Sequence, residues 1–275
     1  MNPGANAVRL SSGGQLDCSQ AITRERTMGV SFIRMMLLIA LLTATAAAQG
    51  QQPPPFSKSG PLDKGWEPLE FPNISRKTQY RLVTDTDGRV LRAEANGSAS
   101  GLITRLNIEP GDSLLLKWRW KVSNVYKKGD ATQKSGDDYP ARIYVAFEYE
   151  PEKTSFFDRV KRKAVSVFAD GELPGSALNY IWANRLPEGE IVTNPFSDET
   201  RMLAVDSGAE QAGKWISHER DIVADYREAF GTAPPAIVGI GVMSDADNTG
   251  EQATAWFGDI QLIRSAQADN QAASD

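Results

Sequence analysis

The sequence predicts an all-β protein: a two-sheet β-sandwich of jelly-roll type with one or two short helices. Short runs of β-branched and aromatic residues recur along the chain, and turn dipeptides such as Asn96-Gly97 and Pro110-Gly111 separate them. The runs are too numerous for a small barrel, which favours two packed sheets. The predicted strands are 90–95, 101–108, 113–122, 142–149, 178–184, 202–205, 236–244 and 253–263.

The N-terminal region has the pattern of an export signal. Residues 35–48 form an apolar run without a charged side chain, shorter than the ~20 residues that cross a bilayer. Basic residues precede this run, and small residues precede Gln49. We expect residues 1–48 to be a signal peptide, with translation starting at Met28 and cleavage near Ala48/Gln49. The protein would then be periplasmic or secreted, without a transmembrane span in the mature chain. An uncleaved anchor helix is the alternative.

Composition excludes several classes of function. The 275 residues carry a net charge of -5, and removal of the signal peptide takes away four Lys/Arg and two Asp/Glu, which changes this charge to -7. The single cysteine, Cys18, leaves as well, so disulfides, cysteine nucleophiles and thiolate metal sites are excluded from the mature chain. An acidic chain also argues against general binding of nucleic acid.

The exported part divides into three segments. Residues 49–61 are rich in Gln and Pro and predict a flexible tether. Residues 62–264 form a single β-sandwich domain, and residues 265–275 form a disordered tail.

Two helices interrupt the strands. Residues 221–230 place apolar side chains at four-residue spacing, with Asp221 as the N-cap and Gly231 as the stop. Residues 155–164 combine an apolar stripe with a strongly basic opposite face. That face is either solvated or in contact with a membrane surface or an anionic polymer.

Strand alternation separates core positions from outward ones. In residues 114–122 the even positions are apolar and include Trp118 and Trp120, which indicates core tryptophans. The outward positions there are Lys117, Arg119 and Lys121. In residues 142–149 the outward positions are Arg142, Tyr144 and Glu148. If the two strands are neighbours, these side chains form one polar patch.

Acidic turns precede two of the strands. Asp137 and Asp138 come before residues 142–149, and Asp245 and Asp247 come before the last strand. Carboxylates in turns suit calcium, which takes six to eight oxygen ligands. The second turn matches only the opening half of a helix-loop-helix calcium loop, because Trp256 replaces the required glutamate. The alternative is that these side chains make hydrogen bonds within their own turns.

Catalytic motifs are few. His218 is the only histidine and lies in a strand-like segment, where we expect it to be exposed or paired; no G-x-S-x-G motif accompanies it. Zinc sites with several histidines are excluded. The chemistry that remains is a lyase-type elimination, with Tyr144 as the base and with Arg142 and Arg119 neutralising a uronate carboxylate.

Seven segments together resemble a known family: 118–122, 137–145, 180–184, 225–227, 230–231, 245–250 and 258–260. They are similar to the bacterial exported family catalogued as domain of unknown function 3047, over about residues 66–262. The resemblance implies one intact domain and no particular reaction. The closing stretch AWFGDIQL also resembles the last strand of galactose-binding-like jelly rolls, and that resemblance implies a structural calcium ion held partly by Asp259.

The resulting hypothesis is an exported β-sandwich that binds a glycan or another polyhydroxylated ligand at a polar sheet face. Arginine and carboxylate groups suit sugar hydroxyls, and Trp182 would supply a stacking surface. The expected ligand-binding residues are Arg119, Lys121, Asp137, Asp138, Arg142, Tyr144, Trp182 and Asn248. One alternative is a polysaccharide-degrading enzyme, a lyase or a hydrolase, that uses the same cleft. Another is an envelope protein that only contacts another protein.

Overall fold

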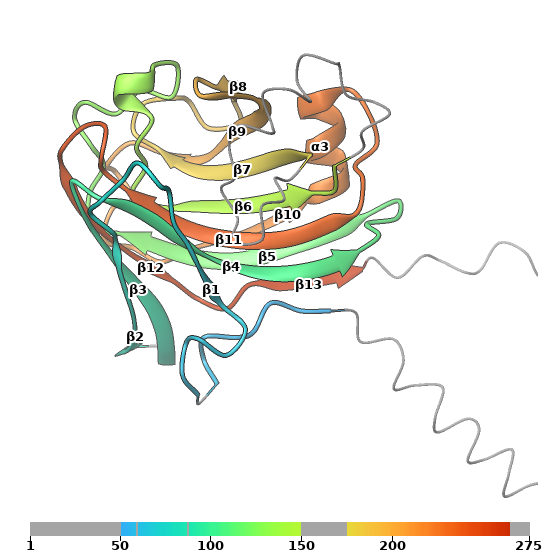
Figure 1. Cartoon of the computed structure of the whole chain (residues 1–275), viewed down its shortest axis with the longest axis horizontal. Coiled ribbons are helices and arrows are strands. Elements are labelled where there is room, and N and C mark those ends of the chain that lie inside the picture. The colour runs from blue at the N-terminus through green and yellow to red at the C-terminus, as the bar shows by residue number, and fades with distance from the viewer. Residues whose placement is uncertain (1–50, 59, 87, 150–174, 265–275) are drawn as a thin grey trace, which may run out of the picture. The chain divides into compact units, whose positions relative to one another are not determined.

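Two β-sheets pack face to face in the computed structural model (Figure 1). The structure describes residues 51–58, 60–86, 88–149 and 175–264. Within these residues, the seven strands of sheet A are, in spatial order, β1 (Glu67–Leu69), β4 (Ala99–Ile108), β11 (Ile237–Asp245), β6 (Arg142–Phe147), β7 (Ser176–Ala183), β9 (Ser197–Ser207) and β8 (Ile191–Asn194). The six strands of sheet B are β10 (Ile216–Asp221), β5 (Leu114–Val122), β12 (Gln252–Phe257), β3 (Gly88–Asn96) and β2 (Gln79–Asp85), with β13 (Gln261–Arg264) also paired to β5.

The chain crosses repeatedly between the sheets, as in a jelly roll. Strands β3, β5, β10 and β12 belong to sheet B, whereas β4, β6 and β11 belong to sheet A. Neighbouring strands of the described residues are antiparallel except β7 and β9, which run parallel. The two-sheet sandwich of jelly-roll type is therefore confirmed.

Alternation along the strands builds the core between the sheets. In β5 the even positions are buried and the odd positions are half-buried, as the sequence predicts. Trp118 and Trp120 thus face inward, where Trp118 packs against Tyr180 of β7 with ring centroids 5.3 Å apart. Burial of such large aromatic side chains is a main source of stability in a sandwich without disulfides.

The predicted helix at 221–230 is confirmed as α3 (Ile222–Phe230). The carboxylate of Asp221 accepts hydrogen bonds from the backbone N–H groups of Val223, at 2.9 Å, and Ala224, at 3.4 Å. Gly231 ends the helix at φ 75°, a left-handed conformation that glycine adopts without strain. A single 3-10 turn, η1 (Lys134–Gly136), precedes β6. The predicted helix at 155–164 lies outside the described residues.

The last predicted strand, 253–263, is wrong as one element, because it is broken into β12 and β13. At the break the N–H of Gly258 donates to the carbonyl of Arg119 at 2.9 Å. A Cβ at residue 258 would lie 2.6 Å from Cγ of Arg119, so only glycine fits beside that side chain. The break lets the chain after β12 lie against β5.

Part of the predicted tether is packed on the domain. Phe56 is 2% exposed and stacks on Trp66, with ring centroids 4.9 Å apart. The side chain of Gln52 donates to the carbonyl of Leu262 at 2.6 Å and accepts from its N–H at 2.9 Å. The flexible tether predicted for 49–61 is therefore wrong for this part. The predicted signal peptide and C-terminal tail lie outside the described residues.

Membrane-spanning helices are not found in the part of the chain that the structure describes, because none of its helices has the required length and apolar character.

Candidate functional site

Apart from Trp182, which is buried in the core, the predicted ligand residues lie on two separate outer faces of the sandwich. Strand β5 pairs with β10, β12 and β13 in sheet B, whereas β6 pairs with β7 and β11 in sheet A. The inward side chains of both strands fill the core between the sheets, so their outward side chains point away from each other. The prediction of one patch shared by Arg119 and Arg142 is therefore wrong.

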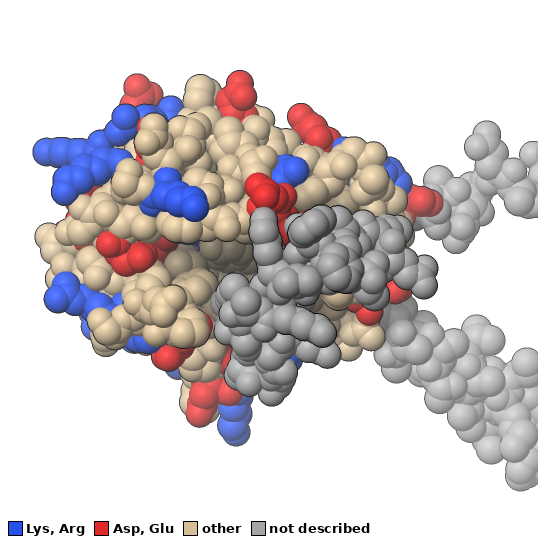
Figure 2. Space-filling view, turned by 45° about the horizontal axis from the view of Figure 1, so that its top comes forward, with Lys and Arg blue, Asp and Glu red and all other residues tan. Residues whose placement is uncertain are grey.

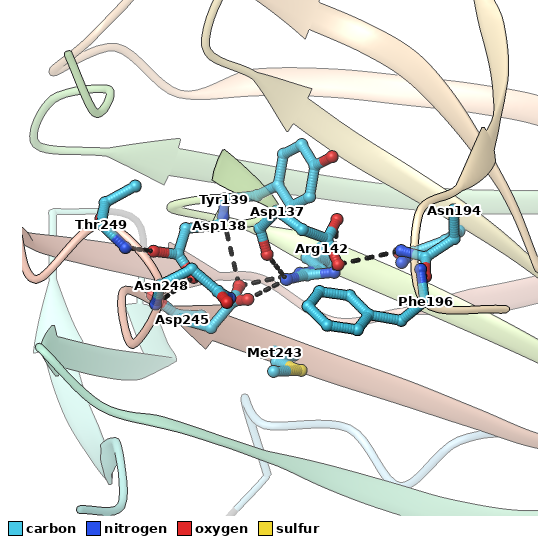
Figure 3. A network of polar contacts seen from close by, with 12 residues as sticks. Asp137, Asp138, Tyr139, Arg142, Asn194, Phe196, Met243, Asp245, Asn248 and Thr249 are labelled. Carbon is cyan, nitrogen blue, oxygen red and sulfur yellow. Dashed lines mark hydrogen bonds and ion pairs between the residues drawn. The ribbon is translucent and has the colours of Figure 1, made fainter. Parts of the chain in front are cut away.

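On the outer face of sheet A, Arg142 is the centre of a polar network (Figure 3). Its side chain is 3% exposed and forms a buried ion pair with Asp245, with Nε donating to Oδ1 at 2.8 Å and Nη2 donating to Oδ2. Nη2 also donates to the carbonyl of Asp137 at 2.8 Å, and Nη1 donates to the hydroxyl of Tyr144 at 3.3 Å. The guanidinium lies 4.4 Å from the ring centre of Tyr139. Arg142 is thus anchored by the protein itself.

Asp138 fastens the turn after β11 to the segment before β6. Its side chain is buried, and Oδ2 accepts from the N–H of Thr249 at 2.6 Å. Oδ1 accepts from the side-chain amide of Asn248 at 3.1 Å (Figure 3). Asp138 and Asn248 were both predicted to bind ligand. In the structure they hydrogen-bond to each other and thereby connect the turn after β11 to the segment before β6.

Three carboxylates form an acidic cluster at this turn: Asp138, Asp245 and Asp247, with one oxygen of each lying within 4.8 Å of the others. Two of the three predicted calcium ligands, Asp245 and Asp247, thus come together. Asp259 lies beyond the other end of β12 and accepts hydrogen bonds from Ser57. Each oxygen of the two buried carboxylates already accepts a hydrogen bond from the protein, and Arg142 neutralises Asp245. This donor set suits a network closed by the protein better than a calcium site.

Burial dominates the protonation of this face. It raises the pKa of Asp137, although Arg142 opposes the shift, and it raises the pKa of Asp247. It also raises the pKa of Tyr144, which keeps this phenol protonated at neutral pH. A lyase base must lose its proton, so the shift opposes the predicted role of Tyr144. Arg119 lies on the other sheet, and the predicted catalytic trio is not assembled.

The outer face of sheet B contains an open groove of about 550 Å³. Its floor is the pairing of β5 with β10, and the segments around Ser57 and Asp259 form a wall. The residues that line it are Ser57, Arg89, Lys117, Trp118, Arg119, Ser217, His218, Glu219, Gly258, Asp259 and Gln261. Arg119 and Asp259, both predicted from the sequence, thus lie together, but in a groove rather than at a metal centre.

Protein contacts hold the charged side chains of the groove. Arg119 lies against the backbone of Gly258, and its guanidinium is 4.6 Å from the ring centre of Trp215. Asp259 accepts from the N–H of Ser57 at 2.8 Å and from its hydroxyl at 2.5 Å. Lys117 and Glu219 form an ion pair across the two strands. Planar donors and acceptors that are fixed before a ligand arrives lower the entropic cost of binding.

Beside the groove, Lys121 lies between two tryptophan rings. Its ammonium is 5.0 Å from the ring centre of Trp215 and 4.6 Å from that of Trp256. It also donates to Asp85 at 2.6 Å, and the indole N–H of Trp215 donates to the same carboxylate at 3.2 Å. The guanidinium of Arg92 lies 5.8 Å from the other ring, that of Trp256. Cation–π contacts of this kind fix both the cations and the rings.

Two aromatic predictions have different outcomes. Trp182 is 0% exposed, and its indole N–H donates to the carbonyl of Gly208 at 3.0 Å, so its predicted stacking role is wrong. His218 is paired, as one of the two expectations had it: Nε2 lies 2.7 Å from Oδ2 of Asp206. That carboxylate also accepts from the indole of Trp120 at 2.6 Å, which links the two sheets.

Seven residues in or beside the groove were not identified by the sequence analysis: Ser57, Arg89, Trp215, Ser217, Glu219, Trp256 and Gln261. The sequence could have predicted the outward orientation of Trp256, because this residue alternates with the small and apolar residues 253, 255 and 257. Ser57 and Arg89 reach the groove only through the packing of the segment before β1, which no local pattern indicates.

The chain matches the profile of a known protein family. The profile of a family described as "Protein of unknown function (DUF3047)" matches residues 64–261. A search of curated protein sequences found none that matches the chain.

Solved structures with related arrangements have low similarity. Cellulose induced protein Cip1 is 10% identical, with 77% of this chain and 96% of that chain covered and a TM-score of 0.39. The carbohydrate recognition domain of Emp47p is 11% identical, with coverages of 79% and 96% and a TM-score of 0.38. The K1 cleaved adhesin domain of Lys-gingipain from Porphyromonas gingivalis W83 is 10% identical, with coverages of 77% and 96% and a TM-score of 0.33. At this level of similarity they say nothing of what this chain binds.

Proposed function

The chain belongs to the DUF3047 family of proteins of unknown function, and for this member we propose that the groove on sheet B binds a glycan. The observation that carries the proposal is the open groove of about 550 Å³, in which polar and charged residues form most of the lining. Ligand sites commonly have roughly 300–1,000 Å³. Carboxylates accept hydrogen bonds from sugar hydroxyls, and guanidinium groups donate paired hydrogen bonds to hydroxyls and to the acidic groups of sugars.

The chemistry of the groove fits a polyhydroxylated ligand. Arg119 and Lys117 offer donors, Asp259 offers acceptors, and Ser217 and Gln261 offer both. All of them lie on adjacent strands or on one wall, within reach of a single small oligosaccharide. The floor is a sheet, so the groups are held on rigid elements.

Export is part of the proposal. The apolar run 35–48, with basic residues before it and small residues at its end, supports secretion to the periplasm or the medium. Polysaccharides are found outside the cytoplasm, so the location and the ligand class agree.

The two rival functions have less support. The lyase mechanism required Tyr144, Arg142 and Arg119 in one cleft, and these residues lie on two opposite faces. A protein-contact module needs an apolar centre. The large hydrophobic side chains that are exposed among the described residues are Phe196 and Ile263. Figure 2 shows acidic and basic side chains interspersed over the face that it presents.

The proposal is tested by measuring the binding of the purified full chain to a panel of neutral and acidic polysaccharides. Affinity electrophoresis and calorimetry are the two assays. Arg119→Met keeps the aliphatic stem over Gly258 and removes the guanidinium. Loss of a hydrogen bond to a charged group costs roughly 1.5–3 kcal/mol, so binding should weaken about tenfold or more.

The matched control is Arg185→Met. Arg185 is exposed and donates one hydrogen bond to the carbonyl of Lys127, away from the groove. The control should bind like the unmodified chain. Equal affinities of the two variants would show that a glycan binds elsewhere, and failure to bind any glycan would refute the proposal. New reducing ends or unsaturated products would instead indicate an enzyme.

A further inference from the structure

We propose that the ligand of the groove is an acidic polysaccharide, and that it continues from the groove across sheet B along a row of basic side chains. The inference rests on the proposed function and narrows it to a class of ligand. The row, called the basic row below, consists of Lys121, Arg92 and Arg81, and Arg119 connects it to the groove.

The first support is the local charge. The basic side chains of the groove and of the basic row are Arg81, Arg89, Arg92, Lys117, Arg119 and Lys121. The acidic side chains in the groove or paired with these are Asp85, Glu94, Glu219 and Asp259. The two sets give this surface a formal charge of +2, whereas the whole chain has -5. A net positive surface on an acidic protein favours a polyanion over a neutral glycan.

The second support is the register of the strands. Lys121 lies opposite Trp256, which lies opposite Arg92, which in turn lies opposite Arg81. Strands are about 4.8 Å apart, so the row extends roughly 14 Å across the sheet. Along β5, Arg119 and Lys121 are two residues apart, about 6.7 Å. The cations therefore form a continuous path from the groove to the edge strand β2, long enough for a polymer rather than a single sugar.

The third support is preorganisation. Trp256 holds Lys121 and Arg92 through cation–π contacts, and Glu94 pairs with both Arg92 and Arg81 at 2.8 Å. The cations are thus fixed at defined positions before a ligand binds. A regular array of fixed charges suits a polymer with a regular charge spacing, such as a polyuronate.

A single-stranded nucleic acid is a polyanion too, but it binds mainly by stacking its bases on aromatic faces. Here the rings of Trp215 and Trp256 each lie against two cations, which are Arg119 and Lys121 for the first, and Lys121 and Arg92 for the second. The rings thus serve to position charges. This arrangement favours the polysaccharide.

The test compares polygalacturonate with its fully methyl-esterified form, which keeps the sugar backbone and lacks the carboxylate charges. We expect the purified full chain to bind the acid form about tenfold more tightly or more, with an affinity that falls as salt is raised. A single-stranded oligonucleotide of similar charge is included as the competing polyanion.

Variants separate the groove from the basic row. Arg81 has a half-exposed side chain on the edge strand, so Arg81→Met should fold. It should weaken binding of polygalacturonate a few-fold and leave binding of a short oligogalacturonate unchanged, whereas Arg119→Met should weaken both. Arg185→Met is the control and should change neither.

The outcomes distinguish the two levels of the proposal. Equal binding of the acid and the ester, binding of neutral glycans alone, or tighter binding of the oligonucleotide would each overturn the acidic polysaccharide. If neutral glycans bind and Arg119→Met weakens their binding, the groove remains the glycan site although its ligand is not acidic. Equal effects of Arg81→Met on the polymer and the short oligomer would overturn the continuation along the basic row.

Discussion

Replacement of Asp245 by asparagine should strongly destabilise the fold. The side chains of Asp245 and Arg142 are 2% and 3% exposed, so the substitution leaves the guanidinium charge buried without its closest partner. Removing one member of a buried pair costs about 3–5 kcal/mol. A domain is stable by only about 5–15 kcal/mol in total, so the loss is a large fraction. For a domain of this size it corresponds to a fall in Tm of roughly 6–20 °C.

This effect is measured by urea denaturation of the full chain, with tryptophan fluorescence as the signal of unfolding. The control is Glu67→Gln, which breaks the Glu67–Arg105 pair, whose side chains are 53% and 45% exposed. Exposed pairs contribute about 0–1 kcal/mol, so the control should stay close to the unmodified chain. If Asp245→Asn costs no more than Glu67→Gln, the role assigned to the buried network is wrong.

Three further predictions concern pH, the groove and calcium. Burial raises the pKa of Asp137 above its unfolded value of 3.8, so the folded state holds a proton that the unfolded chain releases. The stability of the unmodified chain should fall as pH rises through this raised pKa. In urea titrations from about pH 4 to pH 8, the stability of Asp137→Asn relative to the unmodified chain should therefore increase with pH. A stability difference between the two that stays constant over this range would contradict the shift. Gly258→Ala should displace Arg119 without removing its charge and so weaken glycan binding in calorimetry; unchanged affinity would mean that the position of Arg119 is unimportant. Calcium or EDTA should leave Tm unchanged, because protein donors already hold the two buried carboxylates of the acidic cluster; a rise with calcium would restore the predicted metal site.

The sequence could predict what depends on local patterns. The alternation of β5 placed Trp118 inward and Arg119 outward because one face of that strand meets the core and the other meets solvent. The cap of α3 was recognisable because Asp221 and Gly231 act on the backbone next to them.

Pairing between distant strands could not be predicted in this way. Whether Arg119 and Arg142 share a face depends on which sheet each strand joins, and alternation carries no information about this. Strand β7 is buried at every position, so no alternation marked the side of Trp182. The break between β12 and β13 depends on the side chain of Arg119 lying against Gly258, a contact between residues far apart in sequence.

The location of a bound glycan is the central claim, and hydrogen exchange of the full chain with and without polygalacturonate tests it most directly. The glycan should slow exchange in the loop segments that form the groove wall, at residues 57–58 and 258–260. Exchange in the turn at 194–197 and in the segment 137–141, on the outer face of sheet A, should stay unchanged. Slower exchange on the face of sheet A alone would contradict the proposed site.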